Sequence, residues 1–246
     1  RLPSILGFIA ARLALQSKKA LVIEQVGNAK EAMNTHGSLL GRLSAPILHL
    51  INKSIVKKAS HVIYVTPYKL QKDYPTKGVS TSISDVMIPE VLKKEEVDTI
   101  RFFGDKIKIG LIGGFDVRYK GQDVLLDAIS ILPNEVRDVI ELYFVGKGDS
   151  TWIVDYAAEK GLSRNIKFMG AKEGGEEIFK FLEAMSLYVQ PSLTEGMPRA
   201  MLEAMSRGCP VLASKAGGIP DIIQNDFLHA PKDFREFSKQ INCFVQ

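Results

Sequence analysis

Short apolar runs alternate with amphipathic stretches along most of the chain, and this alternation predicts strands that are each followed by a helix. The pattern is most regular in the C-terminal part. There, strands are expected at residues 107–112, 141–145, 165–169, 187–190 and 210–214, and helices at residues 122–132, 151–160, 176–184, 198–207 and 232–242. Strands of about five residues between helices of about ten are typical of right-handed βαβ units around a parallel sheet. We therefore expect an α/β fold.

The N-terminal part repeats this pattern less completely. It predicts helices at residues 3–16 and 38–59 and strands at residues 20–26 and 61–65. Residues 80–105 are rich in Ser, Thr, Lys and Glu, which interrupts the apolar pattern. We accordingly predict two Rossmann-like domains with parallel sheets, at residues 1–100 and 101–246. Two such domains of about 150 residues each would need a longer chain. We therefore expect that the N-terminal domain is incomplete.

Composition places the chain among ordinary globular proteins. Hydrophobic residues make up 46% and charged residues 24% of its 246 residues, which argues against disorder. No apolar run reaches the ~18 residues that span a bilayer, and no secretory leader is recognised. Cys209 and Cys243 are too few for a disulfide framework and suit a reducing compartment. We expect a cytoplasmic protein.

The net charge of +4 is unevenly distributed along the chain. Residues 1–80 hold twelve Lys or Arg against three Asp or Glu, whereas residues 81–246 carry a net charge of −5. A basic N-terminal third favours an anionic partner, such as phospholipid headgroups at the inner face of a membrane or nucleic acid. Scattered solvated lysines are the other interpretation. The helix predicted at 38–59 likewise has two interpretations. It could contact an anionic membrane, or it could be buried on two sides and end in a solvated Lys57–Lys58 pair.

In a parallel α/β sheet, ligands bind outside the carboxyl ends of the strands. The richest such segment follows the strand at 187–190, where Glu195-Gly196-Met197 leads into a helix that Pro198 begins. Free backbone N–H groups and the positive end of the helix dipole make this turn an anion site. Glu203 lies further into the helix. Its simplest alternative role is an ion pair with a neighbouring arginine, Arg199 or Arg207.

A second segment follows the strand at 107–112. Gly113 and Gly114 allow close approach of a ligand, and Arg118 and Lys120 follow in a short basic loop that could neutralise a diphosphate. A solvated loop lysine is the alternative for Lys120. The segment is neither a G-x-G-x-x-G fingerprint nor a G-K-[ST] loop. A third glycine turn, Gly217-Gly218, follows the strand at 210–214.

Taken in this order, the three segments resemble the retaining GT-B glycosyltransferases of the glycosyl transferases group 1 family. Glu195 and Glu203 match the paired-glutamate motif E-x7-E of that family. The resemblance is strong over residues 105–245 and weak over residues 1–90. It implies a GT-B architecture in which the C-terminal domain binds a nucleotide-sugar donor. It also implies that the closing C-terminal helix of the family is missing from this sequence.

The resemblance also implies a role for each matching position. Glu195 would contact the hydroxyls of the donor sugar, and Glu203 would contact those of the ribose. Lys120 would neutralise the diphosphate and act with Glu195 as a catalytic residue. The remaining donor-binding positions would be Gly114, Arg118, Gly170, Ala171, Gly196, Met197 and Pro198, with Gly170 and Ala171 near the base. Because backbone N–H groups and Lys120 would hold the diphosphate, we expect neither a metal ion nor a cofactor.

Two departures from the family pattern stand out. Gly114 occupies a position where the family often has Arg, and Arg118 is the residue that could compensate. Some members place a histidine of the catalytic site after an N-domain strand, and the equivalent stretch here is Gln25-Val-Gly-Asn28. That stretch contains no histidine. The histidines that the N-terminal part does contain, His36, His49 and His61, are expected to be structural or solvated.

The leading hypothesis is a hexosyltransferase that moves a sugar from a UDP- or GDP-linked donor to an acceptor hydroxyl with retention. The acceptor would be a carbohydrate or lipid-linked molecule in polysaccharide or glycolipid assembly, and no nucleic acid would be bound. Two alternatives remain. An epimerase or dehydrogenase would need a glycine fingerprint and a Tyr-Lys pair that the chain lacks. A non-catalytic nucleotide-binding module is disfavoured by the intact Glu195–Glu203 pair.

Overall fold

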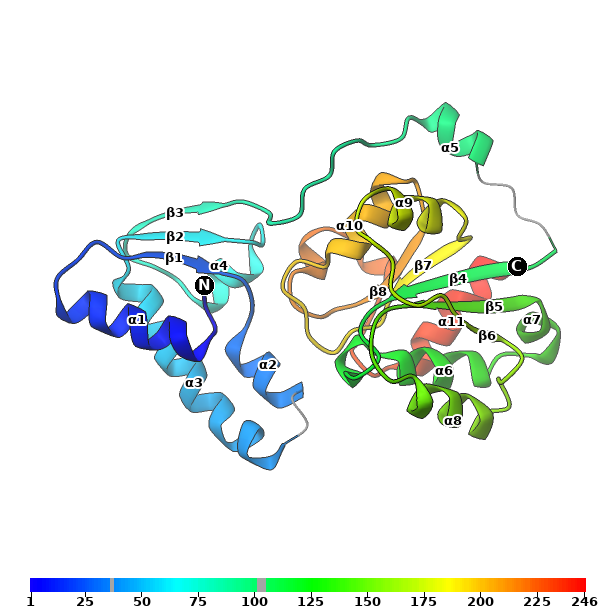
Figure 1. The fold of residues 1–246 in the computed structure, drawn as a ribbon, viewed down its shortest axis with the longest axis horizontal. Coiled ribbons are helices and arrows are strands. Elements are labelled where there is room, and N and C mark those ends of the chain that lie inside the picture. Colours follow the sequence, from blue (N-terminus) through cyan, green and yellow to red (C-terminus); the bar gives the residue numbers. More distant parts are fainter. Residues whose placement is uncertain (36–37, 101–104) are drawn as a thin grey trace. The chain divides into compact units, whose positions relative to one another are not determined.

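The computed structural model describes residues 1–35, 38–100 and 105–246 (Figure 1). His36 and residues 101–104, which begin the predicted second domain, lie outside the described residues. The chain forms two compact units. The first unit comprises Arg1–Met87, Leu193–Pro198 and Ala216–Ile223, and the second comprises Ile88–Ser192, Arg199–Lys215 and Gln224–Gln246.

The second unit contains a six-stranded parallel sheet in the order β6-β5-β4-β7-β8-β9. Its strands are β4 (Ile107–Ile112), β5 (Ile140–Val145), β6 (Ile166–Phe168), β7 (Leu187–Gln190), β8 (Val211–Ser214) and β9 (Leu228–His229). The five predicted strands are confirmed, and the two-residue β9 was not predicted. Strands β5 and β6 lie on one side of β4, and strands β7, β8 and β9 lie on its other side. The carboxyl ends of β4 and β7 therefore form a topological switch point.

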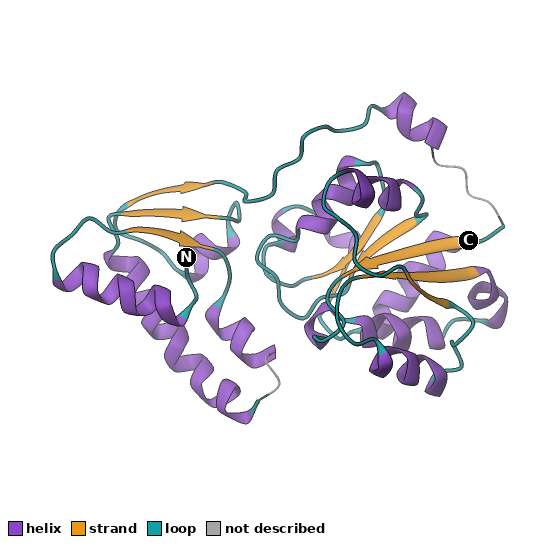
Figure 2. Ribbon diagram, in the orientation of Figure 1, coloured by secondary structure: helices purple, strands orange, loops and turns teal. Residues whose placement is uncertain are grey.

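Helices cover this sheet (Figure 2). They are α6 (Gln122–Ser130), α7 (Asn134–Val139), α8 (Thr151–Glu159), α9 (Glu176–Glu183), α10 (Arg199–Ser206) and α11 (Phe234–Val245). A further helix of this unit, α5 (Lys94–Ile100), precedes β4 in the chain and lies away from the sheet in Figure 1. The five predicted helices are confirmed to within three residues at each end, and α5 and α7 were not predicted. Ile109, Leu142 and Phe144 are completely buried, which accounts for the predominantly apolar sequences of the central strands.

The first unit contains a three-stranded parallel sheet in the order β1-β2-β3. Its elements are α1 (Ile5–Gln16), β1 (Val22–Gln25), α2 (Ala29–Thr35), α3 (Leu39–Lys58), β2 (His61–Tyr64), α4 (Lys69–Asp73) and β3 (Val79–Ser82). The sequence predicted only two of these strands and assigned β3 to the linker region. All four residues of β3 are exposed and only Val79 is apolar, so the strand carries no apolar pattern.

The first unit has its own core, formed by residues such as Leu2, Ile23, Val62 and Tyr64. One side of α3 packs on it, whereas Lys57 and Lys58 are exposed and the side away from the core is open. Burial of α3 on two sides is therefore not observed. In the described ranges, no helix is both long and apolar enough to cross a bilayer.

Candidate functional site

Three glycines continue the ends of neighbouring strands at the carboxyl edge of the second sheet. Gly113 follows β4 and donates its N–H to the carbonyl of Val145 (2.9 Å). Gly146 follows β5 and donates to the carbonyl of Gly170, two residues after β6 (3.0 Å). A side chain at Gly146 would collide with the carbonyl of Gly113. The predicted base-side residue Gly170 thus lies at the same edge as Gly113, and Ala171 follows it in an exposed position.

Lys120 lies directly over the end of β4. A Cβ atom added at Gly113 would come within 2.8 Å of the Lys120 Cγ, so the lysine stem fills the place that a larger residue would take. The short turn Arg118–Lys120 ends at Gly121, whose φ of +79° is left-handed. A side chain at Gly121 would collide with the carbonyl of Pro191, directly after β7. Glycine at this position therefore allows the loops after β4 and β7 to touch at the switch point.

Arg118 does not share this position. Its guanidinium carbon lies 4.5 Å from the centre of the Trp152 ring, a cation–π arrangement on α8. Trp152 is itself held by a hydrogen bond from its Nε1 to the carbonyl of Phe115 (2.6 Å). Gly114 has open space around it, because an added Cβ would meet nothing closer than 3.7 Å. Steric crowding at the Cβ position therefore does not explain why Gly114 stands where the family often has Arg.

Gln122, which the sequence did not single out, also belongs to this edge. It is completely buried at the start of α6, and its Nε2 donates to the carbonyl of Gly114 (3.0 Å). Its Oε1 is buried and has no hydrogen-bond partner among the described residues. In the sequence, its position directly after Lys120-Gly121, at the start of the predicted helix, is the signal that could have identified it.

Glu195, Gly196, Met197 and Pro198 belong to the first unit. There the loop after β7 meets the loop after β8, and Gly218 donates its N–H to the carbonyl of Gly196 (3.0 Å). A side chain at Gly217 would collide with the carbonyl of Glu195. The predicted glycine turns therefore contact each other through their backbones. Glu195 is partly buried, and Pro198 immediately precedes α10.

Glu203, on α10 of the second unit, is half-buried without an ion pair. Arg207 pairs instead with Glu183 (3.5 Å), and among the described residues no cation lies within 4.0 Å of the Glu203 carboxylate. Burial raises the pKa of Glu203, and the charge of Arg199 opposes this shift only in part. The predicted alternative of a simple helix ion pair is therefore not observed. A desolvated carboxylate with spare acceptor capacity can bind a ligand hydroxyl.

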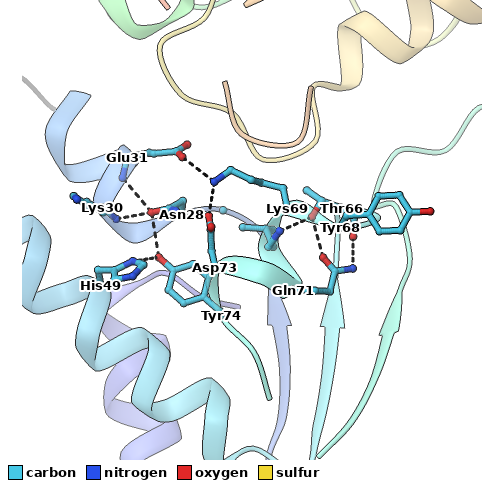
Figure 3. A network of polar contacts seen from close by, with 12 residues as sticks. Asn28, Lys30, Glu31, His49, Thr66, Tyr68, Lys69, Gln71, Asp73 and Tyr74 are labelled. Atoms are coloured by element: carbon cyan, nitrogen blue, oxygen red, sulfur yellow. Dashed lines mark hydrogen bonds and ion pairs between the residues drawn. The ribbon is translucent and has the colours of Figure 1, made fainter. Parts of the chain in front are cut away.

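A polar network follows β1 in the first unit, at the stretch that was expected to correspond to the family's histidine (Figure 3). Asn28 caps α2 by accepting hydrogen bonds from the N–H groups of Lys30 and Glu31 (2.9 and 3.2 Å). The Tyr74 hydroxyl donates to the Asn28 Oδ1 (3.1 Å) and lies 2.9 Å from His49 Nδ1. His49 is therefore structural, as expected, and His61 is exposed.

The same network holds charged groups that the sequence did not single out. Lys69 pairs with Asp73 (2.7 Å) and, more loosely, with Glu31 (3.7 Å). Asn28 donates to the same carboxylate oxygen of Asp73 (2.7 Å). The spacing of Lys69 and Asp73, four residues apart, is the signal that predicts their pairing. Burial raises the pKa of Glu31 despite the nearby lysine.

Comparison with known proteins identifies relatives of both parts of the chain. Residues 106–246 match the family described as "Glycosyl transferases group 1". Protein CapJ of Staphylococcus aureus is 40% identical over 243 residues, which are 98% of this chain and 61% of CapJ. The uncharacterized glycosyltransferase MJ1069 of Methanocaldococcus jannaschii is 26% identical over 231 residues, 89% of this chain and 56% of that protein. The chain thus spans about three-fifths of these relatives.

Solved structures resemble the fold over almost the whole chain. A sucrose-phosphate synthase from Thermosynechococcus elongatus superposes with a TM-score of 0.76 at 20% identity, covering 96% of this chain and 61% of that one. Alr3699/HepE of Anabaena, in complex with UDP-glucose, superposes with a TM-score of 0.71 at 18% identity, covering 98% and 66%. At these identities the likeness shows the fold.

Proposed function

Because the chain belongs to the glycosyl transferases group 1 family and has the GT-B fold, we propose that it is a retaining glycosyltransferase. It transfers a hexosyl group from a UDP- or GDP-linked donor to an acceptor hydroxyl. The acceptor is a carbohydrate or a lipid-linked molecule in polysaccharide or glycolipid assembly.

The observation that carries this proposal is the position of Lys120 at the switch point. The lysine lies over Gly113, and Gly121 brings the loop after β4 against Pro191. Ligands of open α/β sheets bind at such a point. A cation beside strand ends that carry no bulky side chains suits a diphosphate, whose negative charge grows as the bond to the sugar breaks. Lys120 would stabilise that charge.

The other residues complete the proposed donor site. Glu203 would accept hydrogen bonds from the ribose hydroxyls with its unpaired carboxylate, and Glu195 would do the same for the donor sugar. The N–H groups of Gly196 and Met197, ahead of Pro198 and α10, would bind the diphosphate. Gly114, Gly170 and Ala171 would leave room for the phosphates and the base. Arg118 would join the diphosphate only by leaving Trp152.

Relatives support both donor bases. HepE of Anabaena has been crystallised with UDP-glucose, and a mannosyltransferase of Corynebacterium glutamicum that is 27% identical to this chain is GDP-mannose-dependent. A Staphylococcus aureus relative, CapH, is a glycosyltransferase of capsular polysaccharide biosynthesis and is 34% identical over 106 residues. These names support a nucleotide-sugar donor and a polysaccharide setting for this chain.

Titration calorimetry with UDP and GDP tests the donor site. We expect one of them to bind and Lys120→Met to weaken that binding, while Lys239→Met, at an exposed position on α11 of the same unit, leaves it unchanged. Absence of binding to both nucleotides would overturn the proposal. Binding without sugar transfer or donor hydrolysis would favour the non-catalytic module.

Two further measurements test the chemistry. The anomeric configuration of the product, determined by NMR, should match that of the donor, and inversion would contradict the retaining mechanism. We also propose that the reaction needs no metal ion, because Lys120 and backbone N–H groups offset the charge of the leaving group. Activity should therefore survive EDTA, and a loss that magnesium restores would show otherwise.

A further inference from the structure

The side of α3 that faces away from the core of the first unit carries an apolar stripe. Its members recur every three or four residues and are each 61–81% exposed: Leu40, Leu43, Ile47 and Leu50. The opposite side of the helix packs on the core through residues such as Ile55 and Val56. A surface helix of a globular protein normally turns charged and polar residues outward, so this arrangement is the reverse of the usual one.

The neighbouring helix α1 extends the apolar surface. Ile5, Leu6, Ile9 and Leu13 are each more than half exposed. The two helices pack side by side, as Figure 1 shows in blue, and leave a groove between them of about 710 Å³. Apolar side chains of both helices line it: Ile5, Phe8, Ile9, Leu15, Leu48, Ile51 and Ile55. An apolar surface that continues across two helices is typical of an interaction site.

The charges on these two helices have one sign. Neither α1 nor α3 contains an Asp or a Glu. Five exposed cations accompany the apolar stripes: Arg12, Arg42, Lys53, Lys57 and Lys58. Arg12 and Lys58 line the groove itself. The surface therefore combines apolar area with positive charge, which selects a partner that is apolar and anionic at once.

We propose that α1 and α3 form a docking surface for an anionic phospholipid bilayer. The exposed leucines and isoleucines enter the boundary between headgroups and acyl chains, and the arginines and lysines contact the lipid phosphates. Both helices lie in the plane of the membrane, since no helix among the described residues is long and apolar enough to span it. This inference does not depend on the proposed sugar transfer.

A second copy of the chain fits the surface less well. A symmetric dimer would bring the same face of each copy together, and five cations on each side would then oppose one another without any acidic residue on either pair of helices. Anionic lipid supplies the missing negative charge. Self-association is accordingly an outcome that the test must distinguish.

Vesicle binding tests the proposal directly. The chain is mixed with vesicles of phosphatidylglycerol and phosphatidylcholine, or of phosphatidylcholine alone, and bound protein is measured by flotation. We expect binding to the anionic vesicles that weakens as salt is raised, and little binding to the neutral ones. Size-exclusion chromatography of the free chain should show a monomer.

Matched variants separate charge from apolar contact. Lysines near a bilayer each contribute about a five-fold change in binding, so Lys53→Gln, Lys57→Gln and Lys58→Gln together should weaken it about a hundred-fold. The same change at three exposed lysines of the second unit, Lys93, Lys94 and Lys232, serves as control. Leu40→Gln with Leu43→Gln should also weaken binding, whereas Ile131→Gln with Val154→Gln should not. All these residues are exposed, and circular dichroism checks that each variant folds.

Tryptophan quenching reports insertion. The chain has one tryptophan, Trp152, on α8 of the second unit. A Leu43→Trp variant should be quenched by lipids brominated on the acyl chain, and the unmodified chain should not. Failure to bind anionic vesicles, equal binding of the two vesicle types, unaltered binding of the lysine variant or a dimer that buries this surface would each overturn the proposal.

Discussion

The carboxylate of Glu203 links ligand binding to stability in a way that a mutation can expose. Burial raises its pKa above the ordinary 4.5, and no ion pair within 4.0 Å offsets the cost of desolvation in the part of the chain that the structure describes. Because the raised pKa means that the folded state holds the proton more tightly, this carboxylate lowers stability as the pH rises through its pKa. A partly desolvated carboxylate without an ion pair is what the proposed ligand-binding role would require.

We expect Glu203→Gln to weaken UDP or GDP binding about ten-fold, since a charge-assisted hydrogen bond contributes ~1.5 kcal/mol or more. The same variant should unfold at an equal or higher temperature at pH 7, because it no longer buries a charge. Calorimetry and thermal unfolding measure the two effects. Glu183→Gln is the matched control: it breaks the pair with the buried Arg207 and should lower stability without changing nucleotide binding. A destabilised Glu203→Gln protein would contradict this interpretation.

Gly113 and Gly114 should respond in opposite ways to substitution. Gly113→Ala places a methyl group against the Lys120 stem, so it should displace the lysine and weaken nucleotide binding several-fold. Gly114 has room, so Gly114→Arg should fold and strengthen UDP or GDP binding several-fold. Titration with uridine or guanosine provides the control, because a nucleoside without phosphates should bind both variants and the unmodified chain alike.

At the scale of the element, the Tyr74 hydroxyl joins α2, α3 and the end of α4. It accepts a hydrogen bond from the buried N–H of Ala29 (2.9 Å) and donates to Asn28. Tyr74→Phe leaves the buried N–H of Ala29 without this acceptor and removes one of the hydrogen bonds that Asn28 accepts, so it should cost the first unit about 1–3 kcal/mol. Hydrogen exchange should show faster opening of β1 and β2 with β4 and β5 unchanged. Tyr68→Phe, at a hydroxyl on an exposed residue, should have little effect.

The same network predicts a pH dependence. Burial, together with the charge of Lys53, lowers the pKa of His49 below the ordinary 6.5. The folded state therefore favours the neutral imidazole, and the first unit should lose stability as the pH falls below 6.5. Denaturant unfolding between pH 7 and 5 measures this loss. A His49→Gln variant, which keeps an N–H donor for Tyr74 but cannot titrate, should show a flatter profile.

How far the sequence predicts an element depends on its burial. β4 and β7 were predicted at their observed bounds because most of their residues are apolar and their central residues are buried. β3 was missed because its four residues are exposed, and α5 and α7 because helices of six or seven residues are too short to establish a period. The site follows the same rule. Glycines and Lys120 at strand ends are visible in the sequence, whereas the stacking of Arg118 on Trp152 depends on tertiary packing.

At the scale of the whole molecule, the chain runs from β3 to α5 through an exposed segment without regular structure. Residues 83–91 contain no helix or strand, and Ile83, Met87 and Val91 are exposed. The next residues belong firmly to the second unit, since Leu92 donates its N–H to the carbonyl of Ser206 (2.9 Å). Thermolysin, which cuts before large apolar residues, should therefore cleave first between residues 83 and 91. N-terminal sequencing of the products checks this, and first cleavage inside either sheet would contradict it.

The reversal of strand order at β4 also affects how donor preference can diverge among relatives. Residues 146–175, after β5 and β6, form one contiguous stretch of chain on one side of the switch point, and residues 191–218, after β7 and β8, form another on the other side. A single recombination event can exchange either stretch as a cassette. Under the proposed donor site, recognition of the base and recognition of the sugar would then evolve on separate segments of the gene, with Lys120 as the element common to both.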